Sequence, residues 1–464
     1  MTTGMIETRR RRRGRERGVD IMTSLELVID SQFFADGVEL LHNYDPTSDI
    51  GRPRQHSHAA RLLFYFSIHL FGSQRKAERM LQNPGTWNQI RARLRRRFPD
   101  EPLLAPGALP PTRHSIRGIK TAGPEFVREL HHVMQVDAIT KAVDMGLGLN
   151  SGTWLKPSTN SILFGDGVVM RAMSSHPRGT VAIHPDTGEV VTRRSDPNAR
   201  NHTTGGGERV YGNKFTHISG WTGTPNEQIT LGITPTTDVA GDTEAHHALS
   251  FIDSLRENGL TFAGVNWDKA IRGADVEAIW QRGLHPLIGI YDKTGKTTET
   301  IPLPAPKVNG VHVDLVCHRG AVSIADHTGT PIPLTPIKLK SQTAKNGNVR
   351  WYATFTIPAG IDCDTRLWEQ RVEVRVNGVT PGGIKLAEHV RAVAPGSDMY
   401  RELTGNRQLA ETLNSNLKRN ALPGVRARSY GIARQWIDQI IEVHTRNCVA
   451  HALWRQRTQM ARAA

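Results

Sequence analysis

Three acidic residues have the types and surroundings that a two-metal site for phosphodiester chemistry requires: Asp166, Asp268 and Glu411. Mg²⁺ prefers hard carboxylate oxygens and keeps some of its waters for a substrate. Two such ions about 4 Å apart can activate an attacking oxygen and stabilise the departing 3′ oxygen of a phosphodiester. Each acid alone has an ordinary interpretation, so the hypothesis depends on a fold that gathers all three into one pocket.

Glu411 is expected on a helix, within the pattern Arg407-x3-Glu411-x6-Lys418. At 3.6 residues per turn, these spacings return each side chain to one helix face, which also carries Asn414. A carboxylate can bind a divalent metal, whereas Arg and Lys can bind backbone phosphates. The pattern therefore predicts a helix face that could bind both a divalent metal and DNA phosphates. The alternative is an exposed helix with one i,i+4 Arg–Glu pair.

Asp166 and Asp268 are each expected within or at the end of a strand. Asp166 interrupts an apolar run at Gly165-Asp166-Gly167, and Asp268 follows the apolar run 260–267. Strand ends place side chains at the edge of a sheet, where α/β folds usually carry their chemistry. As alternatives, Asp166-Gly167 is a common turn pair, and Asp268 could end a strand or cap the next helix.

The segment 159–292 predicts an α/β layer, because apolar runs typical of strands alternate with helical periodicity. Three strands are followed by a helix, a strand, a helix and a strand. The expected strands are 161–170, 209–220, 228–235, 260–267 and 285–291, and the expected helices are 242–258 and 274–282.

Four further parts surround this layer. Residues 1–22 form a basic tail that is expected to bind phosphates without sequence preference, unless Met22 is the true start. Residues 23–150 predict an all-helical, DNA-binding domain. Residues 293–395 are rich in Pro, Gly and Thr and predict a β-rich insertion. Residues 396–464 are helical again and are expected to complete the catalytic core.

Two expected helices in the N-terminal domain, 57–71 and 74–82, are separated by Gly72-Ser73. The second is basic, so the pair could be a helix-turn-helix, and an ordinary helical hairpin is the alternative. Another basic helix is expected at 89–98. Both basic helices suit the phosphate backbone of a nucleic acid.

The composition points to a polyanionic partner. The chain has 59 Lys and Arg against 44 Asp and Glu, a net charge of +15, which favours nucleic acid first and an anionic membrane surface second. No apolar run approaches the roughly 20 residues that span a bilayer. The three cysteines are widely spaced, which argues against a disulfide framework or a zinc knuckle and makes a reducing cytoplasm the expected compartment.

The chain resembles the DDE-type insertion-sequence transposases, whose RNase H-like catalytic domain supplies Asp, Asp and Glu. The resemblance spans roughly residues 50–455 and is most specific around Glu411. The matching segments are Phe164-Gly165-Asp166-Gly167, Val265-Asn266-Trp267-Asp268-Lys269, Tyr211-Gly212-Asn213-Lys214 and Arg407-x3-Glu411-x6-Lys418. The chain departs from many relatives at Thr404, where they have Tyr, and at Ile271-Arg272.

This resemblance implies an RNase H-like mixed sheet with flanking helices, interrupted by a β-rich insertion and preceded by a helical domain. It implies a DNA transposase in which Asp166, Asp268 and Glu411 hold two Mg²⁺ ions, for which Mn²⁺ can substitute. It further implies cleavage at the element ends, strand transfer into target DNA and a homodimer in the synaptic complex, with a cytoplasmic, nucleoid-associated location. The implied DNA contacts are Arg407, Lys418, Asn414 and Lys214.

Two alternatives stay open. One is a transposase-derived protein that binds DNA without cutting it. The other is an RNase H-like nuclease that cuts DNA without strand transfer. Terminal inverted repeats around the coding region would argue against the nuclease.

Overall fold

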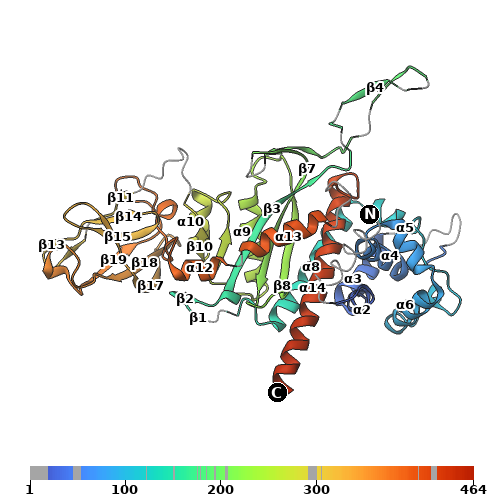
Figure 1. Ribbon diagram of the computed structural model, residues 1–464, viewed down its shortest axis with the longest axis horizontal. Helices are drawn as coiled ribbons and strands as arrows, with labels where there is room; N and C mark the ends of the chain where they lie inside the picture. Colours follow the sequence, from blue (N-terminus) through green and yellow to red (C-terminus); the bar gives the residue numbers. More distant parts are fainter. Residues whose placement is uncertain are drawn as a thin grey trace, which may run out of the picture.

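The computed structural model describes most of the chain. The described residues are 19–44, 54–121, 123–149, 152–174, 176–177, 179–183, 185, 187–192, 195–203, 207–290, 300–304, 306–405, 407–419 and 426–463. Residues 1–18 of the expected basic tail lie outside the described residues. The described residues form a mixed α/β structure with several sheets (Figure 1).

The centre of the molecule is a six-stranded mixed sheet. Five strands lie in the order β8-β7-β3-β9-β10. β7 is antiparallel to both β3 and β8, whereas β9 and β10 run parallel to β3. The sixth strand, β6, pairs with the first residues of β7. The strands are β3 (Ile162–Arg171), β6 (Arg200–Thr203), β7 (Arg209–Trp221), β8 (Gln228–Thr236), β9 (Gly264–Trp267) and β10 (His285–Ile288).

The parallel strands are joined by helices, as their direction requires. α9 (Glu244–Glu257) connects β8 to β9, and α10 (Ala274–Gln281) connects β9 to β10. α9 begins at Glu244 because the hydroxyl of Thr243 caps it by accepting from the amide of His246, which corrects the expected start at Asp242. Every residue of β9 and β10 is buried, including the polar Asn266 and His285, as is expected of parallel strands that are covered on both faces.

Three further helices cover the sheet. α13 (Arg407–Arg419) lies across β3, while α8 (Pro124–Asp144) and α14 (Ile432–Ala463) pack against β8 (Figure 1). Asn447 of α14 accepts from the backbone N–H of Thr230 at 2.9 Å and donates to its carbonyl at 2.8 Å. These bonds occupy the outer backbone edge of β8 at that point, so the edge strand is less open to pairing with another chain.

The N-terminal part is helical and packs on the α14 side of the sheet. Its helices are α2 (Ile21–Asp30), α3 (Gln32–Tyr44), α4 (His58–Phe71), α5 (Gln74–Leu81), α6 (Pro84–Arg97), the short 3₁₀ helix η1 (Pro102–Leu104) and α7 (Arg117–Thr121). α4 is buried at every residue. It ends at Gly72, whose positive φ of 87° allows the chain to turn, and Ser73 then caps α5.

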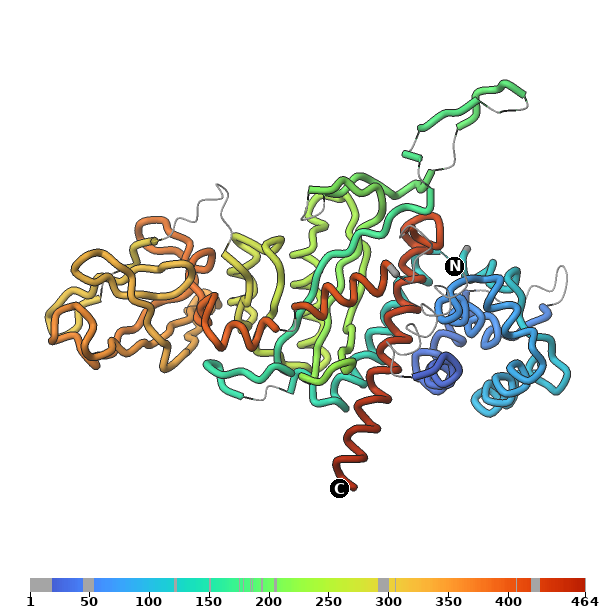
Figure 2. Tube along the Cα trace, viewed as in Figure 1, coloured from blue at the N-terminus to red at the C-terminus, as the bar shows by residue number. Residues whose placement is uncertain are grey.

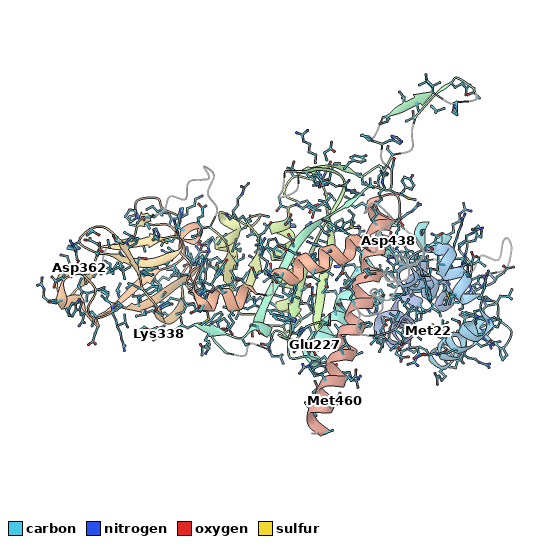
Figure 3. The ribbon with its side chains drawn as sticks, in the orientation of Figure 1. Met22, Glu227, Lys338, Asp362, Asp438 and Met460 are labelled. Atoms are coloured by element: carbon cyan, nitrogen blue, oxygen red, sulfur yellow. The ribbon has the colours of Figure 1, made fainter. Side chains whose placement is uncertain are left out.

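A β-rich region lies at the opposite end of the molecule from these helices (Figures 1 and 2). One sheet has the order β11-β14-β15-β16 and another has the order β17-β18-β19. Asp362 marks its far end in Figure 3. Its strands are β11 (Thr300–Pro302), β12 (Lys307–Val308), β13 (Val311–His312), β14 (Leu315–His318), β15 (Ala321–Ala325), β16 (Pro331–Pro333), β17 (Pro336–Thr343), β18 (Val349–Thr356) and β19 (Arg371–Arg375).

Short elements complete the description. The 3₁₀ helix η3 lies before β19, and α11 and α12 lead from the β-rich region to α13. A small hairpin of β1 and β2 and the 3₁₀ helix η2 precede β3. The bounds are β1 (Gly152–Thr153), β2 (Lys156–Pro157), η2 (Thr159–Ser161), η3 (Thr365–Leu367), α11 (Leu386–His389) and α12 (Asp398–Thr404).

Two features project from the body. The antiparallel hairpin of β4 (Val181–Ile183) and β5 (Val190–Thr192) extends away from the sheet between β3 and β6 (Figure 2). The last turns of α14 extend on another side, where Met460 is exposed (Figure 3). Among the residues described, no helix combines the length and the apolar character needed to cross a bilayer.

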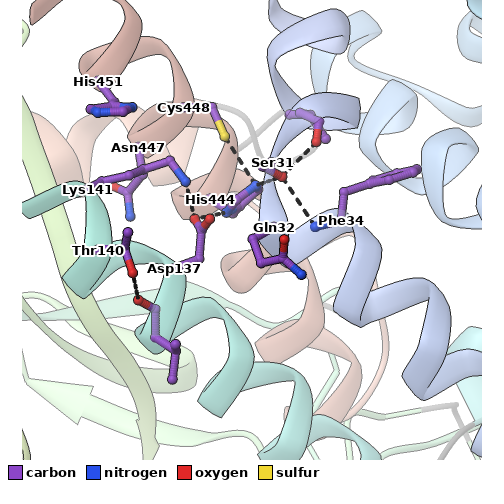
Figure 4. Close-up of polar contacts among 12 residues, drawn as sticks. Ser31, Gln32, Phe34, Asp137, Thr140, Lys141, His444, Asn447, Cys448 and His451 are labelled. Carbon is purple, nitrogen blue, oxygen red and sulfur yellow. Dashed lines mark hydrogen bonds and ion pairs between the residues drawn. The ribbon is translucent and has the colours of Figure 1, made fainter. Parts of the chain in front are cut away.

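A buried polar network joins the N-terminal helices to α8 and α14 (Figure 4). The Nε2 of His444 lies 3.0 Å from the hydroxyl of Ser31 and 3.1 Å from the thiol of Cys448. Its Nδ1 lies 3.3 Å from the carboxylate of Asp137, which also contacts the ammonium of Lys141. Ser31 separates α2 from α3, so this network connects three parts of the fold.

The charges in this network support one another. Burial alone would raise the pKa of Asp137, but His444 and Lys141 hold that pKa well below its usual value. Burial alone would lower the pKa of His444, but Cys448 and Asp137 raise it above its usual value. The contribution of a histidine with a raised pKa is complete below its unfolded pKa of about 6.5 and is lost as pH rises through the folded value.

We therefore expect Asp137→Asn to lower the free energy of unfolding by about 3–5 kcal/mol, because two buried cations lose their counter-ion. Urea denaturation at pH 5.5 and pH 8.5 measures the change. The loss should be larger at pH 5.5, where His444 is charged. Asp398→Asn, which removes an exposed partner of Arg401, is the control and should cost less than about 1 kcal/mol. Equal losses in the two variants would contradict the role of the network.

Candidate metal centre

Three carboxylates converge at the centre of the sheet. Asp166, Glu244 and Asp268 each offer one oxygen, and these oxygens all lie within 4.8 Å of one another. Asp166 is on β3, Asp268 directly follows β9, and Glu244 is the first residue of α9. Three hard oxygen donors at this separation suit a divalent cation such as Mg²⁺ or Mn²⁺.

The pairing of β3 with β9 explains why Asp166 and Asp268 meet. Phe164 pairs with Asn266 in parallel register, and each aspartate lies two residues further along its strand direction. Side chains two residues apart lie on the same face, so the aspartates emerge side by side where β9 ends. The structure thus brings together these two acids, one from within β3 and one from the end of β9.

Two glycines make room for the neighbours of Asp166. A Cβ on Gly165 would lie 2.1 Å from the indole of Trp267, and a Cβ on Gly167 would lie 2.4 Å from Oε1 of Glu244. A side chain on Gly165 would also meet the backbone oxygen of His217 at 2.4 Å, so that position requires glycine, whereas a side chain on Gly167 would displace the carboxylate of Glu244. The indole N–H of Trp267 in turn donates to Oε2 of Glu244 at 3.4 Å. The Gly-Asp-Gly sequence therefore allows Glu244 to reach the pocket.

The site concentrates negative charge. Burial, reinforced by Asp268, raises the pKa of Asp166 to about 6. Burial also raises the pKa of Asp268. Backbone N–H groups donate to both aspartates at 2.8 Å, from Gly167 to Asp166 and from Ala270 to Asp268. A bound cation would relieve the repulsion that remains, so the residues present fit a divalent metal.

Lys214 lies at the edge of this group. It is on β7, and its ammonium forms an ion pair with Oε1 of Glu244. A single positive charge thus already balances part of the acidic cluster. The sequence singled out Lys214 as a DNA contact, and the structure places it within reach of the carboxylates.

α13 approaches Asp166 from the face of the sheet. The Nδ2 of Asn414 donates to Oδ2 of Asp166 at 2.7 Å, and its Oδ1 lies 2.9 Å from Nε2 of His217. At the start of the helix, Arg407 donates to the carbonyl of Trp267 at 3.4 Å. Lys418 is half-buried near the end of the helix. Helix α13 is thus anchored to both strands that carry the aspartates.

Glu411 is exposed and is not one of the three grouped carboxylates. At 100° per residue, Arg407, Glu411 and Asn414 fall within about 60° of one another around the helix axis. Glu411 therefore lies on the same side of α13 as two residues that contact the site. The structure brings Asp166 and Asp268 together and leaves Glu411 beside them on the surface.

Glu244 and His217 were not identified from the sequence. Glu244 is an acid in the first turn of an expected helix, where acids are common because they complement the helix dipole. The spacing alone gives no reason to choose it. His217 gave no clear signal either, because β7 is buried on both faces from Phe215 to Gly220 and the alternation of the strand does not single it out. A buried polar group requires a partner.

No protein-family model matches the chain, and no curated protein matches it. Among solved structures, the chain is similar to a piggyBac transposase in a synaptic complex with hairpin DNA. The sequence identity is 10% and the TM-score is 0.39, over 95% of this chain and 76% of that chain. A likeness of this size carries no conclusion about function.

The approach of Glu244 over Gly167 can be tested directly. We expect Gly167→Ala to weaken Mn²⁺ binding by about 10- to 100-fold, because the new methyl group displaces Glu244. Isothermal titration of the full chain with Mn²⁺ measures the affinity. Gly123→Ala is the control, since a Cβ there would meet nothing within 4 Å. An unchanged Mn²⁺ affinity in the Gly167 variant would show that Glu244 is not a metal ligand.

Proposed function

We propose that this chain is a metal-dependent DNA transposase with an RNase H-like core. The observation that carries the proposal is the group of three carboxylates that forms where β9 ends beside the middle of β3, with Glu244 added from the start of α9. The strand order β8-β7-β3-β9-β10, with three antiparallel strands followed by two parallel ones, is the arrangement expected of an RNase H-like sheet. Both features agree with the resemblance to DDE-type transposases noted in the sequence.

Asp166, Asp268 and Glu244 would hold the metal, and Glu411 would join them if its side chain turned inward from α13. When bound, two Mg²⁺ ions, or Mn²⁺ in their place, supply activation of the attacking oxygen and charge stabilisation at the departing 3′ oxygen. The two aspartates are held by backbone amides and, for Asp166, by Asn414. They therefore need little reorganisation to accept a cation.

The cationic residues around the pocket would hold the DNA backbone. Arg407 and Lys418 lie at opposite ends of α13, and Lys214 lies beside Glu244. A cation that neutralises Glu244 would free the ammonium of Lys214 to contact a phosphate. Water first attacks the phosphodiester at each element end, and the 3′-OH so released then attacks a phosphodiester of the target. No covalent bond between protein and DNA is required.

Double-stranded DNA is the proposed partner, at the element ends and at the target. The net charge of +15 supports a polyanionic partner. Exposed arginines on α5 and α6, namely Arg75, Arg79, Arg95 and Arg96, offer phosphate contacts in the N-terminal helices. Cutting two ends together favours a homodimer in the synaptic complex. The proposed location is the cytoplasm, in association with the nucleoid.

One observation favours the alternatives. Glu411, the acid of the most specific sequence pattern, is exposed rather than grouped with the aspartates. A protein that binds DNA without cutting it, or a nuclease without strand transfer, would tolerate that position. Metal-dependent cleavage and joining to target DNA therefore decide between them and the transposase, and the role of Glu411 decides which acid is the third ligand.

The assignment of the acids can be tested by cleavage of DNA that carries the sequences flanking the coding region. We expect Asp166→Asn to abolish Mg²⁺-dependent cleavage while DNA binding persists. Glu244→Gln should reduce cleavage by about 100-fold. Substituting a residue that only supports a metal ligand typically lowers metal affinity or activity by about 10- to 100-fold, and loss of a ligand itself should lower activity at least as much. Glu402→Gln, an exposed acid on α12, is the control.

The same assay compares Glu411→Gln with Glu244→Gln. A loss in both variants supports a site in which Glu411 turns inward, whereas full activity of the Glu411 variant assigns the third ligand to Glu244 alone. Absence of any metal-dependent cleavage by the unmodified chain would refute the enzyme and leave the DNA-binding protein. Cleavage without joining to target DNA would leave the nuclease.

Phosphate contacts should also appear in the salt dependence of binding. For duplex DNA, the logarithm of the binding constant falls with the logarithm of salt concentration by about 0.9 for each phosphate contact. We expect the double substitution of Arg95 and Arg96 by alanine to reduce this slope by about 1–2. Fluorescence anisotropy with labelled duplex DNA measures it. Arg366→Ala, whose charge is paired with Asp364, should leave the slope unchanged, and an equal change in both would argue against a DNA contact on α6.

A further inference from the structure

A buried histidine completes a hydrogen-bonded chain that ends at Asp166. His217 is on β7 and is the direct cross-strand partner of Asp166 on β3. Cross-strand partners project to the same face of a sheet. His217 is fully buried, so its imidazole lies beneath the site rather than in contact with solvent or substrate.

Asn414 bridges the two residues from α13. Its Oδ1 lies 2.9 Å from Nε2 of His217, and its Nδ2 donates to Oδ2 of Asp166 at 2.7 Å. The amide of Asn414 is itself buried. The other oxygen of Asp166 accepts from the backbone N–H of Gly167. Both carboxylate oxygens are thus held, one by the backbone and one through Asn414.

The tautomer of His217 decides which way the amide points. Oδ1 of Asn414 can only accept, so Nε2 must carry the proton, and Nδ1 must then be a bare lone pair. Among the described residues, Nδ1 has no hydrogen-bond partner. Burying an unpartnered lone pair costs less free energy than burying an unpartnered N–H. Burial lowers the pKa of His217 to about 4, so the ring is neutral at pH 7.

The opposite orientation of the amide is unfavourable. If His217 offered a lone pair at Nε2, the amide would turn its NH₂ group toward the ring and its oxygen toward Asp166. Two oxygens would then face each other in a buried site, unless the carboxyl were protonated. The N–H at Nε2 therefore selects the orientation in which Asn414 donates to Asp166.

We propose that His217 is a positioning residue, which acts through Asn414 to hold the carboxylate of Asp166 in the orientation that receives a divalent cation. This inference rests on the proposed function for the identity of the cation, while the hydrogen-bonded chain itself does not depend on it. Neither His217 nor Asn414 is assigned a proton transfer. Their contribution is to keep one ligand oriented and in place before metal and DNA arrive.

The test compares three replacements of His217 in the full chain. Gln carries an N–H donor the same number of bonds from Cβ as Nε2, whereas the donor of Asn corresponds to Nδ1, and Met fills a similar volume without a donor. We expect His217→Gln to bind Mn²⁺ much as the unmodified chain does. His217→Asn and His217→Met should each weaken Mn²⁺ binding by about 10- to 100-fold. Calorimetric titration with Mn²⁺ measures this, and thermal unfolding confirms that each variant is folded.

A double variant separates positioning from general damage to the fold. If His217 acts only through Asn414, adding His217→Met to Asn414→Leu should cause no further loss of Mn²⁺ affinity, because the bridge is already absent. Additive losses would overturn the proposal. Equal affinities of the Met, Asn and Gln variants would overturn it as well.

A measurement without metal distinguishes this inference from the proposed function. The ¹⁵N spectrum of histidine-labelled protein, assigned by comparison with His217→Gln, reports which ring nitrogen carries the proton. We expect the Nε2–H tautomer, and an Nδ1–H tautomer would overturn the hydrogen-bonded chain. If the unmodified chain shows that tautomer yet binds no Mn²⁺, the proposed function fails while the arrangement of His217 and Asn414 stands.

Discussion

The parallel pairing of β3 with β9 is the interaction on which the rest of the site depends. It places two aspartates side by side where β9 ends, although they are about a hundred residues apart in the sequence. Their charges repel, and burial increases the cost. The backbone amides of Gly167 and Ala270 and the ammonium of Lys214 beside Glu244 offset part of that cost. The pocket is therefore an arrangement that the sheet imposes on groups that would otherwise separate.

The surrounding elements maintain this arrangement in different ways. Gly165 and Gly167 omit side chains, so that Trp267 and Glu244 can approach β3. α13 contributes contacts at both ends, through Arg407 to the end of β9 and through Asn414 to β3. α14 bonds to the outer edge of β8 and, through His444, to the N-terminal helices. The geometry of the pocket thus depends on residues from almost the full length of the described chain.

The sequence was informative where the local pattern determined the structure. Apolar runs located the strand that carries Asp166 and the strand that Asp268 follows. The register between these strands, which brings the two acids together, is not determined by either run alone. Helical spacing located the face of α13 that lies toward the site. Spacing does not determine how a helix is rotated about its axis against a sheet. The sequence therefore could not show that Asn414, rather than Glu411, contacts Asp166. Glu244 could not be selected because its place depends on a close approach over Gly167. The projecting hairpin of β4 and β5 was also missed, since its strands are only three residues long.

The late position of α13 and α14 in the chain has a consequence for synthesis on the ribosome. Asn414 follows Asp166 by 248 residues, and Leu413 and Leu417 on α13 are buried in the same core as Val168 and Phe215 of the sheet. Until those helices emerge, an apolar sheet surface stays uncovered, and at about 5–20 residues per second that interval lasts for many seconds. Exposed apolar surface favours aggregation, so a nascent chain of this kind is most vulnerable during that interval, and a product that ended before α13 would keep the surface exposed.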